Sequence, residues 1–259
     1  MTAAAAKGDS AAGMKNHRRS NLLSPRGVMA AALLLTGMAA AQPDAAGYAA
    51  QRKAMVSRQI AARGVRDPLV LKAMSEVPRH LFVPADLAAE AYRDTPLPIG
   101  EGQTISQPYI VALMTECLGL EGHEKVLEVG TGSGYQAAVL GRIAASVDTI
   151  EIHPGLARRA AATLERLGYS NVHVRAGDGF FGWPEEAPFD AVMVTAAAPE
   201  VPPALFAQLR EGGRLVIPIG DPSATQRLTV VTKRQGKPRV ERVLDVRFVP
   251  MTGEILKKK

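Results

Sequence analysis

The sequence predicts an α/β fold with a doubly wound, mainly parallel sheet. From Lys125 onward, short apolar runs alternate with longer segments of helical spacing, as expected for parallel strands joined by helices. The first apolar run ends in three closely spaced glycines, which allow a helix to start beside a bound ligand. A chain of 259 residues with 47% hydrophobic content can bury one full-size core.

The core is expected to alternate strands and helices and to end in a hairpin. Its elements are predicted as strand 125–129, helix 134–145, strand 147–151, helix 154–167, strand 171–175, strand 189–195, helix 203–210 and strand 214–219. The later segments 227–232 and 239–246 are apolar runs with no long helix between them. They predict C-terminal antiparallel strands that turn near Gly236.

The segment before the core is expected to form an N-terminal helical cap. Helical spacing predicts a helix over 48–62, and Asp67 followed by Pro68 is typical of the start of a second helix. Prolines interrupt the chain over 84–102, which predicts loops, and a further helix is expected over 108–118.

One main domain with terminal additions is the simplest division of the chain. We expect a leader over 1–54 and a single domain over 55–259. Within that domain, the predicted parts are the cap and the segment after it (55–122), a ligand-binding core (123–225) and the C-terminal strands with a tail (226–259).

The leader has the pattern of a secretory signal. Basic residues precede an apolar run over 28–41 that ends in small residues, and this run is short for a membrane span. Two other interpretations stay open: an alanine-rich disordered leader, or translation that starts at Met55.

The net charge of +6 belongs to the two ends of the chain. Residues 1–53 contribute +5 and residues 257–259 contribute +3, so residues 54–256 carry −2. The body therefore has no charge excess typical of nucleic-acid binding. Cys117 is the only cysteine, which excludes an intrachain disulfide and a cysteine metal cluster, and no histidine spacing indicates a metal site.

The glycine turn favours a cationic cofactor over a dinucleotide. The dinucleotide pattern needs a third glycine where this chain has Tyr135. Glu128, just before the turn, would repel a pyrophosphate but suits S-adenosylmethionine (SAM). Glu151 ends the next strand, where such folds bind ribose hydroxyls. The predicted cofactor residues in these two places are Glu128, Gly130, Thr131, Gly132, Gly134 and Glu151.

A third candidate cofactor element follows strand 171–175. Gly177, Asp178 and Gly179 come at the same end of the sheet as the glycine turn, and the carboxylate of Asp178 could accept a hydrogen bond from an adenine amino group. An ordinary tight turn is the alternative, because Asp and Gly are common in turns.

These motifs resemble the protein-L-isoaspartate (D-aspartate) O-methyltransferase family. The resemblance spans about 55–253, and the leader lies outside it. It is carried by the blocks RHLFVP at 79–84, QTISQP at 103–108, EVGTGSG at 128–134, GDG at 177–179 with APFD at 187–190, TAAAP at 195–199, QLREGGRL at 208–215 and FVPM at 248–251. The first two blocks and the last are more specific than the glycine turn, which many SAM enzymes share.

The resemblance implies a Rossmann-like, SAM-dependent methyltransferase. Its reaction would be methyl transfer to the side-chain carboxylate of L-isoaspartyl and D-aspartyl residues in damaged proteins, and the ester would then cyclise to a succinimide. Ser106 would be the active-site serine. Weaker substrate-binding assignments fall on Thr104, Ile105, Phe248, Val249 and Pro250.

The expected chemistry needs no catalytic base. A carboxylate has a reference pKa of about 4, so it is already a nucleophile at neutral pH. Ser106 could instead be the N-cap of helix 108–118, and the two roles are compatible because a helix start offers amide donors to a carboxylate.

Two other functions stay open at this level. One is a SAM methyltransferase acting on RNA or a small metabolite, against which the charge of the body argues. The other is a secreted binding domain without turnover. The expected partners are isoaspartyl proteins and peptides, with no nucleic acid, stable membrane association or obligate partner. A cytoplasmic location is favoured because SAM is made there, against the signal-like leader.

Overall fold

The computed structural model describes residues 47–221 and 223–257. All the structure described here belongs to one compact unit, within residues 43–259. The signal-like run over 28–41 therefore lies outside the described residues. Among residues 47–221 and 223–257, no helix has the length and apolar character needed to cross a bilayer.

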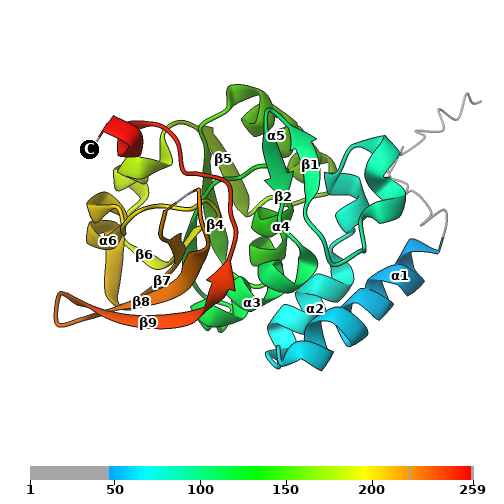
Figure 1. Cartoon of the computed structure of the whole chain (residues 1–259), viewed down its shortest axis with the longest axis horizontal. Coiled ribbons are helices and arrows are strands. Elements are labelled where there is room, and N and C mark those ends of the chain that lie inside the picture. The colour runs from blue at the N-terminus through cyan, green and yellow to red at the C-terminus, as the bar shows by residue number, and fades with distance from the viewer. Residues whose placement is uncertain (1–46, 222, 258–259) are drawn as a thin grey trace, which may run out of the picture. The chain divides into compact units, whose positions relative to one another are not determined.

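A seven-stranded sheet forms the centre of the molecule, in the order β5-β4-β3-β6-β7-β8-β9 (Figure 1). Its strands are β3 (Lys125–Val129), β4 (Ser146–Glu151), β5 (Val172–Ala176), β6 (Phe189–Val194), β7 (Leu209–Ile219), β8 (Gln226–Arg234) and β9 (Lys237–Val246). The first five are mutually parallel and the last two antiparallel. The predicted doubly wound sheet with C-terminal antiparallel strands is thus confirmed.

The connecting helices are α4 (Tyr135–Gly141), α5 (Pro154–Arg166) and α6 (Pro203–Gln208). Helix α4 is shorter than predicted, because the chain must turn into β4, where Ala145 and Ser146 both donate to the Glu124 carbonyl. Strand β7 begins earlier than predicted, because Leu209 already pairs with Phe189 of β6 before the register shifts.

The N-terminal cap is helical, as predicted. It contains α1 (Tyr48–Ala54), the π-helical turn η1 (Met55–Ile60), η2 (Ala61–Arg63), α2 (Pro68–Glu76), η3 (Arg79–Phe82) and η4 (Ala85–Glu90). The helix passes from α1 into η1 without a break, so the predicted domain boundary at 54 falls inside it. Tyr48 at the start of α1 stacks on His80 of η3, with 4.1 Å between the ring centroids, so the first helix contacts a later part of the cap.

A small hairpin, which the sequence did not predict, lies between the cap and the core. Strands β1 (Leu97–Gly100) and β2 (Gln103–Ile105) pair antiparallel. Pro96 and Pro98 made a loop the expectation for the first strand. Pro98 is tolerated within β1 because the β1–β2 pair is separate from the main sheet. Helix α3 (Pro108–Leu118) follows directly and confirms the predicted helix.

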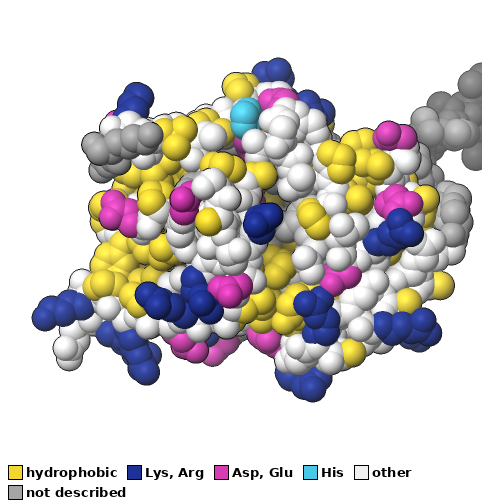
Figure 2. Space-filling view, viewed as in Figure 1, with side chains coloured by type: hydrophobic (Ala, Val, Ile, Leu, Met, Phe, Trp, Pro, Cys, Tyr) yellow, Lys and Arg dark blue, Asp and Glu magenta, His cyan; other side chains and the backbone are white. Residues whose placement is uncertain are grey.

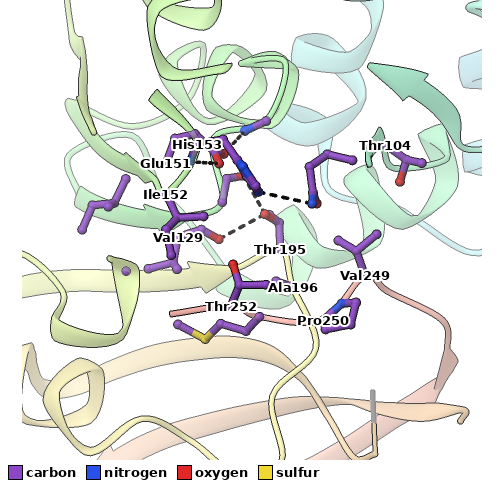
Figure 3. Close-up of a pocket in the computed structure, with 16 residues that line it drawn as sticks. Thr104, Val129, Glu151, Ile152, His153, Thr195, Ala196, Val249, Pro250 and Thr252 are labelled. Carbon is purple, nitrogen blue, oxygen red and sulfur yellow. Dashed lines mark hydrogen bonds between the residues drawn. The ribbon is translucent and has the colours of Figure 1, made fainter. Parts of the chain in front are cut away.

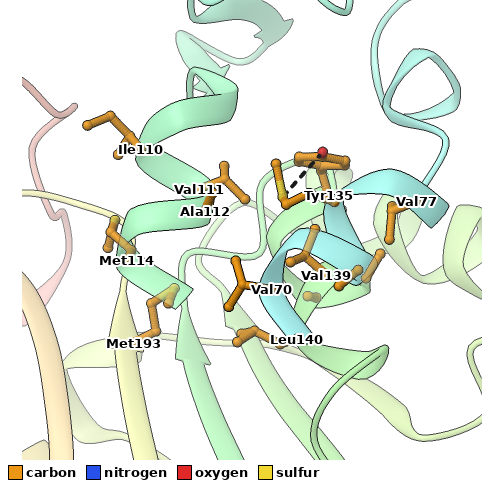
Figure 4. Packing of buried hydrophobic residues seen from close by; sticks show 14 of the residues in the cluster. Val70, Val77, Ile110, Val111, Ala112, Met114, Tyr135, Val139, Leu140 and Met193 are labelled. Carbon is orange, nitrogen blue, oxygen red and sulfur yellow. Dashed lines mark hydrogen bonds between the residues drawn. The ribbon is translucent and has the colours of Figure 1, made fainter. Parts of the chain in front are cut away.

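Two apolar clusters cover the two faces of the sheet. The larger contains residues of α2, α3 and α4, among them Val70, Met114 and Leu140, together with Met193 of β6 (Figure 4). The second lies around Leu205 of α6 and residues near the C-terminus. The central strands of the sheet therefore lie between two layers of apolar side chains.

Candidate active site

The candidate site lies at the carboxyl ends of β3, β4 and β6. The chain leaves β3 toward β4 and β5 and later returns to β6 on the other side, so this is the switch point where doubly wound sheets bind ligands. A first compartment opens there (Figure 3). Its wall includes Gln103, Thr104, Val129, Gly130, Gly132, Ile150, Glu151, Ile152, His153, Gly179, Thr195, Ala196, Val249, Pro250, Met251 and Thr252.

The glycine turn is shaped by close packing. Gly130 has φ 99°, and a Cβ there would lie 2.3 Å from the Thr195 hydroxyl, which donates to the Gly130 carbonyl at 2.7 Å. Gly132 has φ 53° and lines the compartment. Gly134, by contrast, does not line it, and a Cβ there would lie 3.3 Å from the Leu164 side chain of α5. Its role is to start α4 close to its neighbour.

Glu151 lies where the sequence predicted, on the wall of the first compartment. Its side chain is 4% exposed, and it accepts hydrogen bonds from the backbone N–H of Gly132 at 2.8 Å and of His153 at 3.0 Å. The carboxylate thus holds the glycine turn and the end of β4 together. Each oxygen keeps a further lone pair for a ligand hydroxyl.

Glu128 does not line the first compartment. Its side chain is completely buried and accepts a hydrogen bond from the Thr149 hydroxyl, which also bonds to the Thr131 hydroxyl. Burial raises the pKa of the Glu128 carboxyl to about 8, so the group is mainly protonated at neutral pH. The Glu128 side chain therefore lies behind the wall of the first compartment, and its expected contact with a cationic cofactor stays a prediction.

The GDG turn contributes one glycine to the wall. Gly179 lines the first compartment, whereas Gly177 and Asp178 do not. The Asp178 carboxylate accepts from Phe180 N at 2.9 Å and from Glu254 N at 2.7 Å. It therefore joins the turn to η7 (Glu254–Lys257) near the C-terminus.

A second compartment adjoins the first. It is lined by Arg63, Pro96, Thr104, Ser106, Gln107, Ile110, Thr195, Thr225, Leu244, Asp245, Val246, Arg247, Phe248 and Val249. Thr104, Thr195 and Val249 line both compartments. The structure thus brings the predicted active-site serine, Ser106, together with the predicted substrate residues Thr104, Phe248 and Val249, while Pro250 lies on the first compartment.

A smaller hollow lies between these walls and the glycine turn. Ile105, Ser106 and Thr131 line it together with Thr104 and Thr195. Thr131 is buried and reaches this hollow rather than the first compartment. Ile105 is buried as well. Both residues line this hollow and neither lines the two larger compartments.

Ser106 is not the N-cap of α3. That position belongs to Gln107, which makes no side-chain cap hydrogen bond. The first helical amides already have partners, since Tyr109 N donates to Asp94 Oδ1 and both Ile110 N and Val111 N donate to the Gln107 carbonyl. Within residues 47–221 and 223–257, the Ser106 hydroxyl has no hydrogen-bond partner. This hydroxyl is therefore available to a ligand, whereas the expected amide donors are not.

The charges of the second compartment are unequal. Arg63 pairs with Asp94 at 2.5 Å, and Asp245 pairs with Arg227 at 3.0 Å. Arg247 is exposed and has no ion-pair partner in the described part of the chain. The compartment therefore presents one uncompensated cation, which favours an anionic ligand.

Several wall residues were not among those predicted. Thr195 follows β6 as Glu151 ends β4, so the rule that ligands bind at the carboxyl ends of strands could have identified it. His153 and Arg247 carried no comparable signal in the sequence. They line the site because β4 and the segment after β9 end there.

The first compartment fits SAM. Gly130, Gly132 and Gly179 leave room for a ligand to approach the backbone, and Glu151 offers acceptors for hydroxyl groups. Apolar groups of Ile150, Val249 and Met251 provide surfaces for a ring. This combination suits a nucleoside with an attached charged chain.

Comparison with known proteins identifies the family. The model of the protein-L-isoaspartate(D-aspartate) O-methyltransferase family, PCMT, matches residues 50–256. The chain belongs to this family. It is 58% identical over 214 residues to protein-L-isoaspartate O-methyltransferase 2 of Shewanella sediminis, covering 83% of this chain and 88% of the relative. It is 56% identical over 224 residues to the Opitutus terrae enzyme, covering 86% and 96% of the two chains.

Solved structures agree with this PCMT assignment. A protein-L-isoaspartate O-methyltransferase superposes with a TM-score of 0.71 at 34% identity, covering 79% of this chain and 67% of the other. A Plasmodium falciparum PCMT in complex with S-adenosyl-L-homocysteine (SAH) superposes with a TM-score of 0.67 at 28% identity, covering 78% and 98%. Family membership assigns the reaction: SAM-dependent methylation of isoaspartyl residues in protein repair.

Proposed function

We propose that the two compartments divide this reaction between them, with SAM in the first and the isoaspartyl residue in the second. The observation that carries the proposal is their common wall, formed by Thr104, Thr195 and Val249. Ligands in the two compartments would meet at that wall. Bringing two reactants together in this way can lower a barrier by roughly 7 to 11 kcal/mol.

On the cofactor side, Glu151 would accept hydrogen bonds from the ribose hydroxyls, and Gly130, Gly132 and Gly179 would leave space for the nucleoside. Glu128 and Thr131 would act indirectly. The Thr149 hydroxyl bonds to both side chains and so links the glycine turn to the end of β3. When bound, SAM supplies a methyl group made electrophilic by its sulfonium.

Three further predicted cofactor residues have different proposed roles. Asp178 does not line the first compartment, and its carboxylate already accepts hydrogen bonds from Phe180 N and Glu254 N. It would bind the adenine amino group through a remaining carboxylate lone pair. Gly177 would allow the turn that carries it. Gly134 would contribute through the position of α4.

On the substrate side, the Ser106 hydroxyl would donate a hydrogen bond to one oxygen of the isoaspartyl carboxylate. The carboxylate is ionised at neutral pH, so no side chain has to remove a proton. Thr104 and Ile105 would fix the segment on one side, and Phe248, Val249 and Pro250 would contact the peptide on the other. The role of the chain is therefore orientation rather than acid or base catalysis.

We extend the proposal to the fate of the product and to D-aspartyl residues. Methylation converts the carboxylate into an ester, which the neighbouring peptide nitrogen attacks to form a succinimide as methanol leaves. The partners are damaged proteins and peptides. No obligate partner or stable membrane association is part of the proposal.

RNA is a poor alternative substrate. On the face drawn in Figure 2, Lys and Arg side chains lie at separate points among acidic ones rather than in one continuous patch. Residues 54–256 carry a net charge of −2. Both observations speak against the phosphate contacts that RNA binding requires.

We place the reaction in the cytoplasm because SAM is available there. N-terminal sequencing of the mature chain would overturn this location if the mature chain began near Gln42.

The proposed function is tested with radiolabelled SAM and a matched pair of peptides. One peptide contains an L-isoaspartyl residue and the other a normal aspartyl residue in the same sequence. We expect label only in the first, with a D-aspartyl peptide labelled more slowly. Equal labelling of both peptides, or labelling of RNA alone, would contradict the proposal.

A further inference from the structure

We propose that Asp94 is a positioning residue for Ser106, acting as a clamp on the segment 106–109. The proposal rests on the role assigned above to Ser106. Asp94 lies outside the motifs of the site, in the turn before β1, and it does not line either compartment.

One carboxylate joins three groups around this segment. Asp94 Oδ1 accepts from the backbone N–H of Tyr109 at 3.1 Å. Asp94 Oδ2 accepts from Gln107 Nε2 at 3.1 Å and pairs with Arg63 Nη1 at 2.5 Å. Two of these three bonds hold Gln107 and Tyr109, the first and third residues after Ser106.

Arg63 closes the arrangement from the cap. Its guanidinium carbon lies 3.4 Å from the centroid of the Tyr109 ring, so the same cation contacts both Asp94 and the first turn of α3. Arg63 ends η2, which belongs to the N-terminal cap. The cap and the active-site segment are thus joined through Asp94.

The clamp replaces a cap that α3 lacks. The N-cap residue Gln107 makes no side-chain bond to the helix, and Asp94 supplies the missing acceptor from another part of the chain. A carboxylate at a helix N-terminus is favourable because of the helix dipole. Pro108 fixes φ at the first helical position, so holding residues 107 and 109 leaves Ser106 little freedom.

The ion pair by itself is a weak reason for this arrangement. The side chains of Arg63 and Asp94 are 44% and 23% exposed, and such pairs contribute little to stability. A hydroxyl that must meet a carboxylate oxygen is more sensitive, since a displacement of about 1 Å can cost roughly 100-fold in rate. We therefore expect Asp94 to affect turnover more than stability.

The test compares Asp94→Ala and Asp94→Asn with Glu90→Ala as a matched control. Glu90 lies four residues earlier and pairs with Arg93, a pair with exposed side chains away from the site. We expect kcat for the isoaspartyl peptide to fall at least tenfold in Asp94→Ala and less in Asp94→Asn, which keeps an acceptor for Tyr109 N. The Kd for SAH should stay within about twofold, and Glu90→Ala should match wild type.

A double mutant separates positioning from a merely structural role. Because Asp94 acts through Ser106, Asp94→Ala should lower kcat little further in a Ser106→Ala background, whereas a general structural defect would add its full effect. If Asp94→Ala folds poorly, the same cycle is run with Asp94→Asn. Unchanged kcat in the single variants, or full additivity in the cycle, would overturn the inference. Failure of the wild type to label isoaspartyl peptide would instead refute the proposed function.

Discussion

Glu151 binds the backbone N–H of Gly132 at 2.8 Å, so the acid that ends β4 is bonded directly to the glycine turn that follows β3. Both residues line the first compartment, so this contact lies in its wall. It also gives Glu151 two functions, because the residue that would bind a ligand hydroxyl also holds the turn.

Substitution of Glu151 should therefore weaken cofactor binding strongly. We expect Glu151→Ala to raise the Kd for SAH at least tenfold, measured by isothermal titration calorimetry, because both a ligand acceptor and the support for Gly132 are lost. Glu151→Gln, which keeps one oxygen, should cause a smaller change. Glu185→Ala removes an exposed carboxylate paired with Arg175 and serves as the control. Wild-type affinity in Glu151→Ala would contradict the proposed role.

Ser106→Ala should lower turnover without lowering stability. The hydroxyl has no partner in the described part of the chain, so its removal leaves no buried group unsatisfied. Loss of a hydrogen bond to a charged group, about 1.5 to 3 kcal/mol, corresponds to roughly a 10-fold to 100-fold fall in kcat/KM. Methylation of an isoaspartyl peptide and thermal unfolding are measured together. A fall in Tm with unchanged turnover would show a purely structural serine.

Glu128 should make the stability of the enzyme depend on pH. Burial raises its pKa from 4.5 to about 8, so between these values the folded chain keeps a proton that the unfolded chain releases. Stability should fall as pH rises through this range, by about 1.4 kcal/mol per pH unit from this group, and level off above it.

Glu128→Gln removes this ionisation and tests its sign. Urea unfolding from pH 5 to 9 should show the variant gaining stability relative to wild type as pH rises. Its Kd for SAH should stay within a few fold at pH 7, because the amide resembles the protonated acid. Parallel stability curves would show that Glu128 does not hold the proton.

Arg247→Gln should weaken binding of the peptide rather than the chemical step. Arg247 is the uncompensated cation of the second compartment, so its removal should raise KM for an isoaspartyl peptide by about twofold to fivefold, with kcat little changed. The KM of wild type should rise more steeply with salt than that of the variant. Arg239→Gln, an equal charge change on exposed β9, is the control. Equal effects of both substitutions would show that net charge alone matters.

Local pattern was sufficient for most of the sheet. Alternation of apolar runs with helical spacing located β3, β4, β5 and β6 within a few residues; β3, β4 and β6 are mostly buried, whereas β5 is a partly exposed edge strand. The boundaries that differed depend on distant partners. The start of β7 depends on pairing between Leu209 and Phe189, and β1 depends on pairing with β2.

The site divides in the same way. Glu151 could be located from the sequence because the residue that ends a parallel strand must lie at the ligand-binding edge of the sheet. The direction of the Glu128 side chain, one strand away, could not. In β3 its side chain is buried beside Thr149 of the neighbouring strand β4. This burial raises the pKa of the Glu128 carboxyl.

The class of fold, the glycine turn and the membership of the chain in its family could all be predicted from residue order within short segments. Three features needed the folded chain: Ser106 is not the helix cap, Thr195 is part of the common wall, and Asp94 accepts a hydrogen bond from Tyr109 N. These facts are contacts between residues far apart in the chain, and such contacts exist only once the sheet has brought its edges together.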